Sequence, residues 1–157
     1  MSPEGGRVAA RLAELGLRLP LVATPVAAYV PAVRSGDLVW TSGQLPFVDG
    51  ELPATGKVGA EVDPEKAADL ARICALNAIA AVGAEVGDLD RVRRVVKVVG
   101  FVASAPSFTG QPAVINGASG LLGEVFGDAG RHARSAVGVA ALPLDAPVEV
   151  EVVVEVS

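Results

Sequence analysis

Arg134 has the side chain in this sequence that is best suited to binding an organic anion. If residues 132–141 form a strand, Arg134 shares one face with Ala136 and Gly138, which leave empty space beside it. A guanidinium is always charged, and its fork of N–H donors matches a carboxylate. The alternative is an arginine that pairs with a glutamate or covers an interface with its aliphatic stem. Chemistry alone favours this structural alternative.

Glu149 and Glu151 lie in the segment 148–156, where alternation places the carboxylates on one strand face and valines on the other. If this segment forms a hairpin with residues 132–141, about four strand residues, or roughly 13 Å, separate Arg134 from Glu149. That distance is too long for an ion pair and leaves room for a pocket. A solvated strand face is the other interpretation.

Two further places in the sequence carry polar atoms that a pocket can use. Tyr29 is the only tyrosine, and Ser42–Gly43 follows an expected strand, so together they offer hydroxyls and backbone N–H groups. Neither is specific, because tyrosine is common in strands and Ser-Gly often ends one. His132 could serve Ser135 or Ser42 as a base, but the sequence has no G-x-S-x-G nucleophile elbow. A lone histidine at this position is typical of a strand-end surface residue.

Hydrophobic periodicity predicts the elements that must position these residues. In chain order they are a short helix on Val8, Leu12 and Leu15, strands at 26–33 and 38–42, a helix from Asp63–Pro64–Glu65 to Gly87, a strand at 91–104, a helix after 107–112 that ends at Gly127, and strands at 132–141 and 148–156 joined as a hairpin. Gly117, Gly120 and Gly123 cost the second long helix about 0.5–1 kcal/mol each, so we expect close packing against a sheet there. Cys74 is expected to be a small buried hydrophobe.

This order of elements predicts an α+β fold, because two amphipathic helices have a single sheet to cover and should pack on one face of it. We expect Arg134 and the glutamates on the other face, which would be broad, partly apolar and open to water. A closed ring oligomer would cover that face. The expected domain organisation is a helical extension at 1–21 followed by a single domain at 22–157.

Composition excludes several classes of protein. The 157 residues are 51% hydrophobic and 20% charged, which excludes intrinsic disorder. Cys74 and His132 are the only residues of their kinds, so an intrachain disulfide, a cysteine-rich zinc site and a histidine cage are not expected. Net charge is −5, and only 4% of residues are aromatic, which disfavours nucleic acid as a partner. We see no signal peptide and no run of 18 apolar residues, so we expect no membrane span and a cytoplasmic location.

Two signatures carry a resemblance to a known family. Tyr29 followed by Arg34–Pro46 (RSGDLVWTSGQLP) is similar to the N-terminal signature of the Rid family, also called YjgF. Ala133–Pro143 followed by Val148–Glu151 resembles the family's C-terminal signature, and the likeness covers residues 22–156. It implies a chorismate-mutase-like α+β fold that assembles into a barrel-like homotrimer with clefts at the subunit seams.

The resemblance also implies an activity: hydrolysis of reactive 2-imino and 2-enamino acids to 2-keto acids and ammonia, with no cofactor and no metal. Arg134 would then clamp the substrate carboxylate, and Glu149 would position or activate the attacking water. The resemblance places Tyr29, Ser42, the Gly43 amide, Asn116 and Ala136 around the substrate. Ala136 stands where many of the deaminases have a cysteine. Two alternatives stay open, a non-catalytic binder of small carboxylates and an endoribonuclease, of which the acidic charge disfavours the second.

Overall fold

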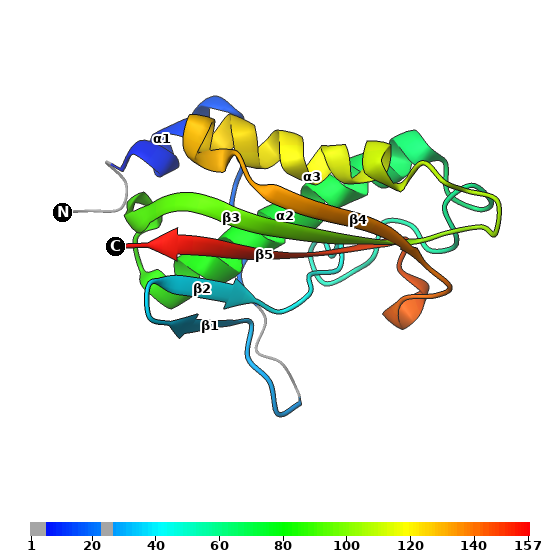
Figure 1. Cartoon of the computed structure of the whole chain (residues 1–157), viewed down its shortest axis with the longest axis horizontal. Coiled ribbons are helices and arrows are strands. Elements are labelled where there is room, and N and C mark those ends of the chain that lie inside the picture. Colours follow the sequence, from blue (N-terminus) through cyan, green and yellow to red (C-terminus); the bar gives the residue numbers. More distant parts are fainter. Residues whose placement is uncertain (1–5, 23–26) are drawn as a thin grey trace.

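A five-stranded sheet with helices packed on one of its faces forms the fold (Figure 1). The computed structural model describes residues 6–22 and 27–157. Its elements are α1 (Arg7–Glu14), β1 (Ala32–Ser35), β2 (Leu38–Thr41), α2 (Pro64–Val86), η2 (Leu89–Arg91), β3 (Val92–Ala103), α3 (Gln111–Phe126), η3 (Gly127–Gly130), β4 (Ala133–Val139), η4 (Pro143–Asp145) and β5 (Val148–Val156). The strand order is β1-β2-β5-β3-β4. The α+β class predicted from the sequence is confirmed.

Strand β5 lies at the centre of the sheet, antiparallel to β2 on one side and to β3 on the other. Its five valines at even positions are buried beneath the helices, whereas Glu149, Glu151 and Glu155 lie half-buried on the opposite face. The alternation predicted from the sequence is therefore confirmed. The face that carries the glutamates has no α-helix on it among the described residues, and it is called the open face below.

The core helix α2 begins at Pro64 and ends at Gly87, where φ is +83°. Asp63 occupies the expected N-cap position, but its side chain makes no capping hydrogen bond. By length and composition alone α2 could cross a membrane, a test that core helices of soluble proteins also pass, and 56% of its most apolar window is buried in the fold. Cys74 is fully buried on α2, and burial raises the pKa of its thiol, as expected of a small core hydrophobe.

The last two strands do not form the hairpin that the sequence predicted. Strand β4 runs parallel to β3 at the edge of the sheet, and the segment 140–147 crosses the end of β3 before β5 begins. Backbone hydrogen bonds close this crossing, from Ala103 N to Pro147 O and from Ser104 N to Val139 O. The long strand β3 therefore separates the two strands, because each of its edges pairs with one of them.

The register of this pairing shows which face each residue of β4 occupies. Arg134 lies opposite Val98, which is buried beneath the helices, so Arg134 is on the helix-covered face and not with the glutamates. Val137, three residues further on, lies opposite Phe101 on the open face and is 44% exposed. The sequence misplaced Arg134 because the face of each side chain follows from the register between paired strands, which is set by residues distant along the chain.

Only one of the three glycines of α3 has the close packing expected for all of them. A Cβ on Gly117 would lie 2.8 Å from the carbonyl carbon of Ala68, so this glycine lets α3 approach α2 rather than the sheet. Gly120 and Gly123 have no heavy atom within 4 Å of such a Cβ. Their place in the sequence therefore has no packing explanation.

Helix α1 packs onto the rest of the fold, with Val8 and Leu12 in the common core as their spacing predicted. The N–H groups of Arg7 and Val8 both donate to the carboxylate of Asp90, at 2.8 Å each. These hydrogen bonds lower the pKa of Asp90. The predicted strand at 26–33 is displaced to Ala32–Ser35, and its first residue, Val26, lies outside the described residues.

Candidate functional site

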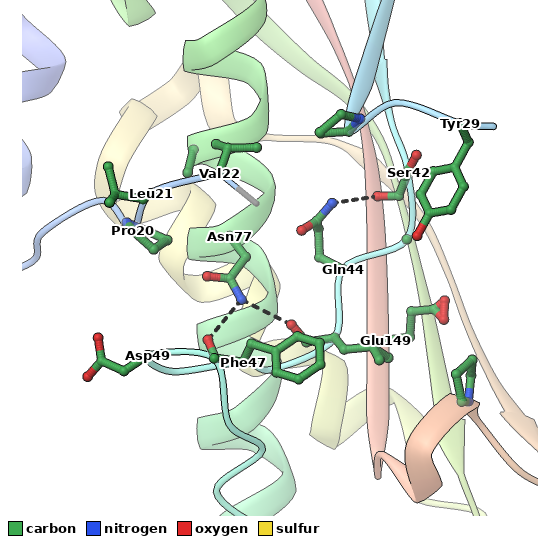
Figure 2. Close-up of a pocket in the computed structure, with 16 residues that line it drawn as sticks. Pro20, Leu21, Val22, Tyr29, Ser42, Gln44, Phe47, Asp49, Asn77 and Glu149 are labelled. Atoms are coloured by element: carbon green, nitrogen blue, oxygen red, sulfur yellow. Dashed lines mark hydrogen bonds between the residues drawn. The ribbon is translucent and has the colours of Figure 1, made fainter. Parts of the chain in front are cut away.

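A pocket of about 820 Å³ lies where β2 ends and the loop 43–50 begins (Figure 2). It is lined by four of the residues that the sequence indicated: Tyr29, Ser42, Gly43 and Glu149. The rest of its wall is largely apolar and includes Pro20, Leu21, Val22, Leu45, Phe47 and Pro143. A carboxylate in such surroundings is less hydrated than one on an open surface.

A β-bulge shapes this end of β2. Trp40 pairs with Val153 of β5, and Gln44 pairs with Val150. The segment from Trp40 to Gln44 therefore has one residue more than the segment of β5 that it faces. The extra residue falls in the stretch that contains Ser42–Gly43. Bulges bend a strand and redirect its side chains, and they are common beside active sites. This one brings the Ser42–Gly43 backbone over β5.

The missing side chain of Gly43 leaves room for Glu149. A Cβ at residue 43 would lie 2.8 Å from the carboxyl carbon of Glu149 and would overlap its Oε2. Among the described residues, no backbone carbonyl accepts from the Gly43 N–H, which leaves this donor available to a ligand. The Ser42 hydroxyl is engaged, because it donates to the carbonyl oxygen of Val30 at 2.6 Å and so ties down the segment that carries Tyr29.

Burial raises the pKa of Glu149 above that of an ordinary glutamate, and the neighbouring charge of Glu151 raises it further. A carboxylate with a raised pKa binds a proton more readily at neutral pH. Glu149 therefore has the properties of a general base, in contact with a pocket that can hold a small molecule.

Asn77 on α2 is a supporting residue that the sequence reasoning missed. Its Nδ2 donates to the carbonyl oxygens of Leu45 and Phe47, at 3.0 and 3.2 Å, and so anchors the loop that forms one wall of the pocket (Figure 2). No signal in the sequence identified it, because the loop and the helix are about thirty residues apart along the chain.

Arg134 belongs to a second polar group, which lies between β4 and α3. Its Nη1 donates to Asn116 Oδ1 at 2.8 Å and to Ser119 Oγ at 3.3 Å. Ala136 lies on the same face of β4, opposite Gly100. The structure therefore brings together three residues that the sequence indicated, Arg134, Asn116 and Ala136.

Two members of this second group were missed or misassigned. Ser119 follows Asn116 by three residues, a spacing that puts both on one face of a helix and that could have identified it. His132 was interpreted as a surface residue at a strand end, but it is half-buried and its ring contacts Ser119 and the carbonyl oxygen of Gly130.

Within one chain, the pocket at Glu149 and the polar group at Arg134 are separate. Arg134 lies on the helix-covered face of edge strand β4, whereas Glu149 lies on the open face of β5, with β3 between the two strands. The distance of about 13 Å that the sequence predicted assumed a hairpin of these two strands, so it does not apply to Arg134 and Glu149. Within residues 6–22 and 27–157, no group of three or more His, Cys, Asp or Glu side chains is placed to hold a metal ion.

The α+β sheet and these two polar groups define a class of protein. Residues 9–156 match the family described as "YjgF/chorismate mutase-like, putative endoribonuclease". The chain belongs to this family, as its two signatures suggested.

Particular relatives extend the comparison. The chain is 51% identical to Protein TCP17 of Trypanosoma cruzi, over 97% of this chain and 96% of that protein. It is also similar to the crystal structure of Atu1372 from Agrobacterium tumefaciens, a protein of unknown function, with 50% identity, a TM-score of 0.90 and coverage of 96% and 93% of the two chains. Escherichia coli TdcF, solved with bound serine, is 28% identical with a TM-score of 0.64, over 88% of this chain and 99% of that one.

Proposed function

We propose that the protein hydrolyses reactive 2-imino and 2-enamino acids to 2-keto acids and ammonia, at a site that Arg134 of one copy and Glu149 of another form together. The observation that carries the proposal is that the chain has both a guanidinium at a sheet edge and a half-buried carboxylate at a pocket. Because the two lie on opposite faces within one chain, a site that uses both requires a second copy.

The assembly we propose is a homotrimer. Val33, Trp40 and Val137 are 51%, 50% and 44% exposed, and edge strand β4 has no strand beyond it among the described residues. An exposed apolar face and an unpaired edge both favour association. A closed ring repeats the same contact at every seam and can place the β4 edge of one copy beside the pocket of the next.

The reaction needs orientation and one activated water. Arg134 pairs with the substrate carboxylate, and Glu149 takes a proton from a water that attacks C2 of the C=N bond. The new C–O bond forms as the π electrons move to nitrogen, and Glu149 delivers the proton taken from water to that nitrogen, which gives a carbinolamine. Glu149 then takes the hydroxyl proton as the C=O bond forms and gives it to the departing nitrogen, which leaves as ammonia. Imino acid and water thus become keto acid and ammonia, with no covalent bond to the protein.

The remaining pocket residues support these two. The free Gly43 N–H suits the attacking water or the oxygen that develops charge, and the apolar wall limits access of bulk water. Tyr29 offers a second donor at the mouth of the pocket. Ala136 leaves space beside the guanidinium for a carboxylate.

The test generates 2-iminopropanoate in solution and follows pyruvate release above the spontaneous rate. Wild type should accelerate release, and Arg134→Ala should lower kcat/KM about 100-fold, since it removes a charge-assisted contact. Arg131→Ala is the matched control, because this exposed arginine lies three residues earlier, outside β4. Equal release by wild type and Arg134→Ala would refute the proposal.

A second candidate is non-catalytic binding of a small carboxylate, which Ala136 favours because the side chain found in many of the deaminases is absent there. Thermal stabilisation by pyruvate that Arg134→Ala abolishes, without turnover of any imine, would support it. Cleavage of RNA is disfavoured by the net charge of −5. Purified protein that leaves RNA intact would remove that activity from consideration.

A further inference from the structure

The single histidine of the chain takes part in a line of hydrogen bonds that ends at Arg134. His132 Nδ1 lies 2.6 Å from the carbonyl oxygen of Gly130, which can only accept, so in the neutral ring Nδ1 carries the proton and Nε2 accepts. Ser119 Oγ lies 2.8 Å from Nε2 and donates its single hydrogen there. Towards Arg134, 3.3 Å away, the Ser119 oxygen is therefore an acceptor.

This arrangement determines which edge of the guanidinium remains available. Nη1 has two hydrogens, and Asn116 Oδ1 and Ser119 Oγ accept them. Among residues 6–22 and 27–157, neither Nε nor Nη2 of Arg134 has a hydrogen-bond partner. These two atoms form one side of the guanidinium fork, and a carboxylate can bind both of them at once.

We propose that Ser119 and His132 are positioning residues, which hold Arg134 so that its Nε–Nη2 edge receives the substrate carboxylate. The inference rests on the proposed function. His132 keeps the Ser119 hydroxyl pointing away from the guanidinium, and without this restraint the hydroxyl could turn its hydrogen toward Nη1. A mobile guanidinium would then lose more conformational freedom when it binds an anion.

The role has a kinetic signature. A carboxylate keeps its charge throughout imine hydrolysis, so Arg134 contributes equally to binding of the substrate and of the transition state. Loss of such uniform binding raises KM and leaves kcat almost unchanged. A serine beside a histidine also resembles a nucleophile with its base, and the kinetics distinguish the two roles. Removal of a nucleophile would lower kcat.

The experiment compares five single variants and one double variant with wild type. Ser119→Ala and His132→Phe each remove a hydrogen bond between His132, Ser119 and Arg134. Ser119→Thr keeps a hydroxyl, and His132→Gln keeps an acceptor. Ser107→Ala is the control in an exposed loop. Calorimetry gives the Kd for 2-ketobutanoate, kinetics with 2-iminobutanoate give KM and kcat, and thermal unfolding shows that each variant is folded.

We expect both disrupting variants to raise Kd and KM about 5–10-fold with kcat within about twofold, as for loss of one hydrogen bond. The two conservative variants and Ser107→Ala should bind as wild type does. Ser119→Ala combined with His132→Phe should bind no worse than Ser119→Ala alone, because the two act in series.

An unchanged Kd in Ser119→Ala, or a fall in kcat at constant KM, would overturn the positioning role. Binding also separates this inference from the proposed function. If wild type binds 2-ketobutanoate but hydrolyses no imine, the deaminase proposal fails and the Kd values still decide the role of Ser119. If wild type neither binds the keto acid nor hydrolyses the imine, both proposals are wrong.

Discussion

Gly43 and Glu149 are in such close contact that the carboxylate occupies the space where any other residue at position 43 would place its Cβ. We expect Gly43→Ala to displace the carboxylate and to lower kcat about 10–100-fold, as loss of a general base would. In the Glu149→Gln background the same change should cause little further loss. Gly120→Ala, a substitution into open space, should leave kcat unchanged. Additive losses in the double variant would show that Gly43 acts independently of Glu149.

Glu151 should control the pH dependence of the reaction. Burial and the charge of Glu151 both raise the pKa of Glu149, and activity as a base is lost as pH falls through that pKa. Glu151→Gln removes one cause, so the acid limb of the kcat/KM profile should move to lower pH. Burial is the larger cause and is retained, so the pKa of Glu149 should stay above the ordinary range. Glu155→Gln, further along the same face of β5, should leave the limb in place.

Two glycines on one helix should respond to alanine in opposite directions. Gly117→Ala would press a methyl group into the backbone of α2 at Ala68, and such overpacking costs about 1–3 kcal/mol. Gly120→Ala meets no atom and should stabilise the fold by about 0.5–1 kcal/mol, since alanine favours helix. Urea denaturation at one protein concentration measures both. If the two substitutions change stability equally, the close contact between Gly117 and α2 does not disfavour a side chain at residue 117.

Asp90 should make the attachment of α1 sensitive to acid. Its pKa is lowered in the folded protein, so its stabilising effect is complete above the pKa of an unfolded aspartate and is lost as pH falls through the lower, folded value. Asp90→Asn should speed exchange of the α1 amide hydrogens at neutral pH. Asp69→Asn, an exposed carboxylate on α2, is the control. If Asp90→Asn leaves exchange in α1 unchanged, the two backbone hydrogen bonds do not hold this helix.

The proposed assembly predicts a mass in solution of about three times the 15.8 kDa of one chain. Light scattering measures it directly. Val137→Asp places a charge on the open face and should lower that mass, whereas the same change at an exposed position away from this face, Ala113→Asp, should not. A monomer at micromolar concentration in the wild type would exclude a site shared between copies.

Local patterns in the sequence were enough to predict much of this protein. Alternating valines and glutamates identified β5 and its buried face, and Asp63–Pro64 and Gly87 marked the ends of α2. Such features depend on neighbours a few residues apart, so hydrophobic period and helix-end preferences reveal them. The two family signatures likewise identified Arg134 and Glu149 as a pair of interest.

The tertiary structure alone decided on which side of the sheet each of these two side chains lies. Alternation shows that a strand has two faces, but the face a residue occupies follows from the register of pairing with the neighbouring strand, and that pairing is formed by residues distant along the chain. Arg134 pairs with Val98 of β3 and faces α3, whereas Glu149 pairs with Phe101 of the same strand and faces away from it. The same pairing brought His132 to Ser119, a contact between a helix and a strand end that no local pattern contains.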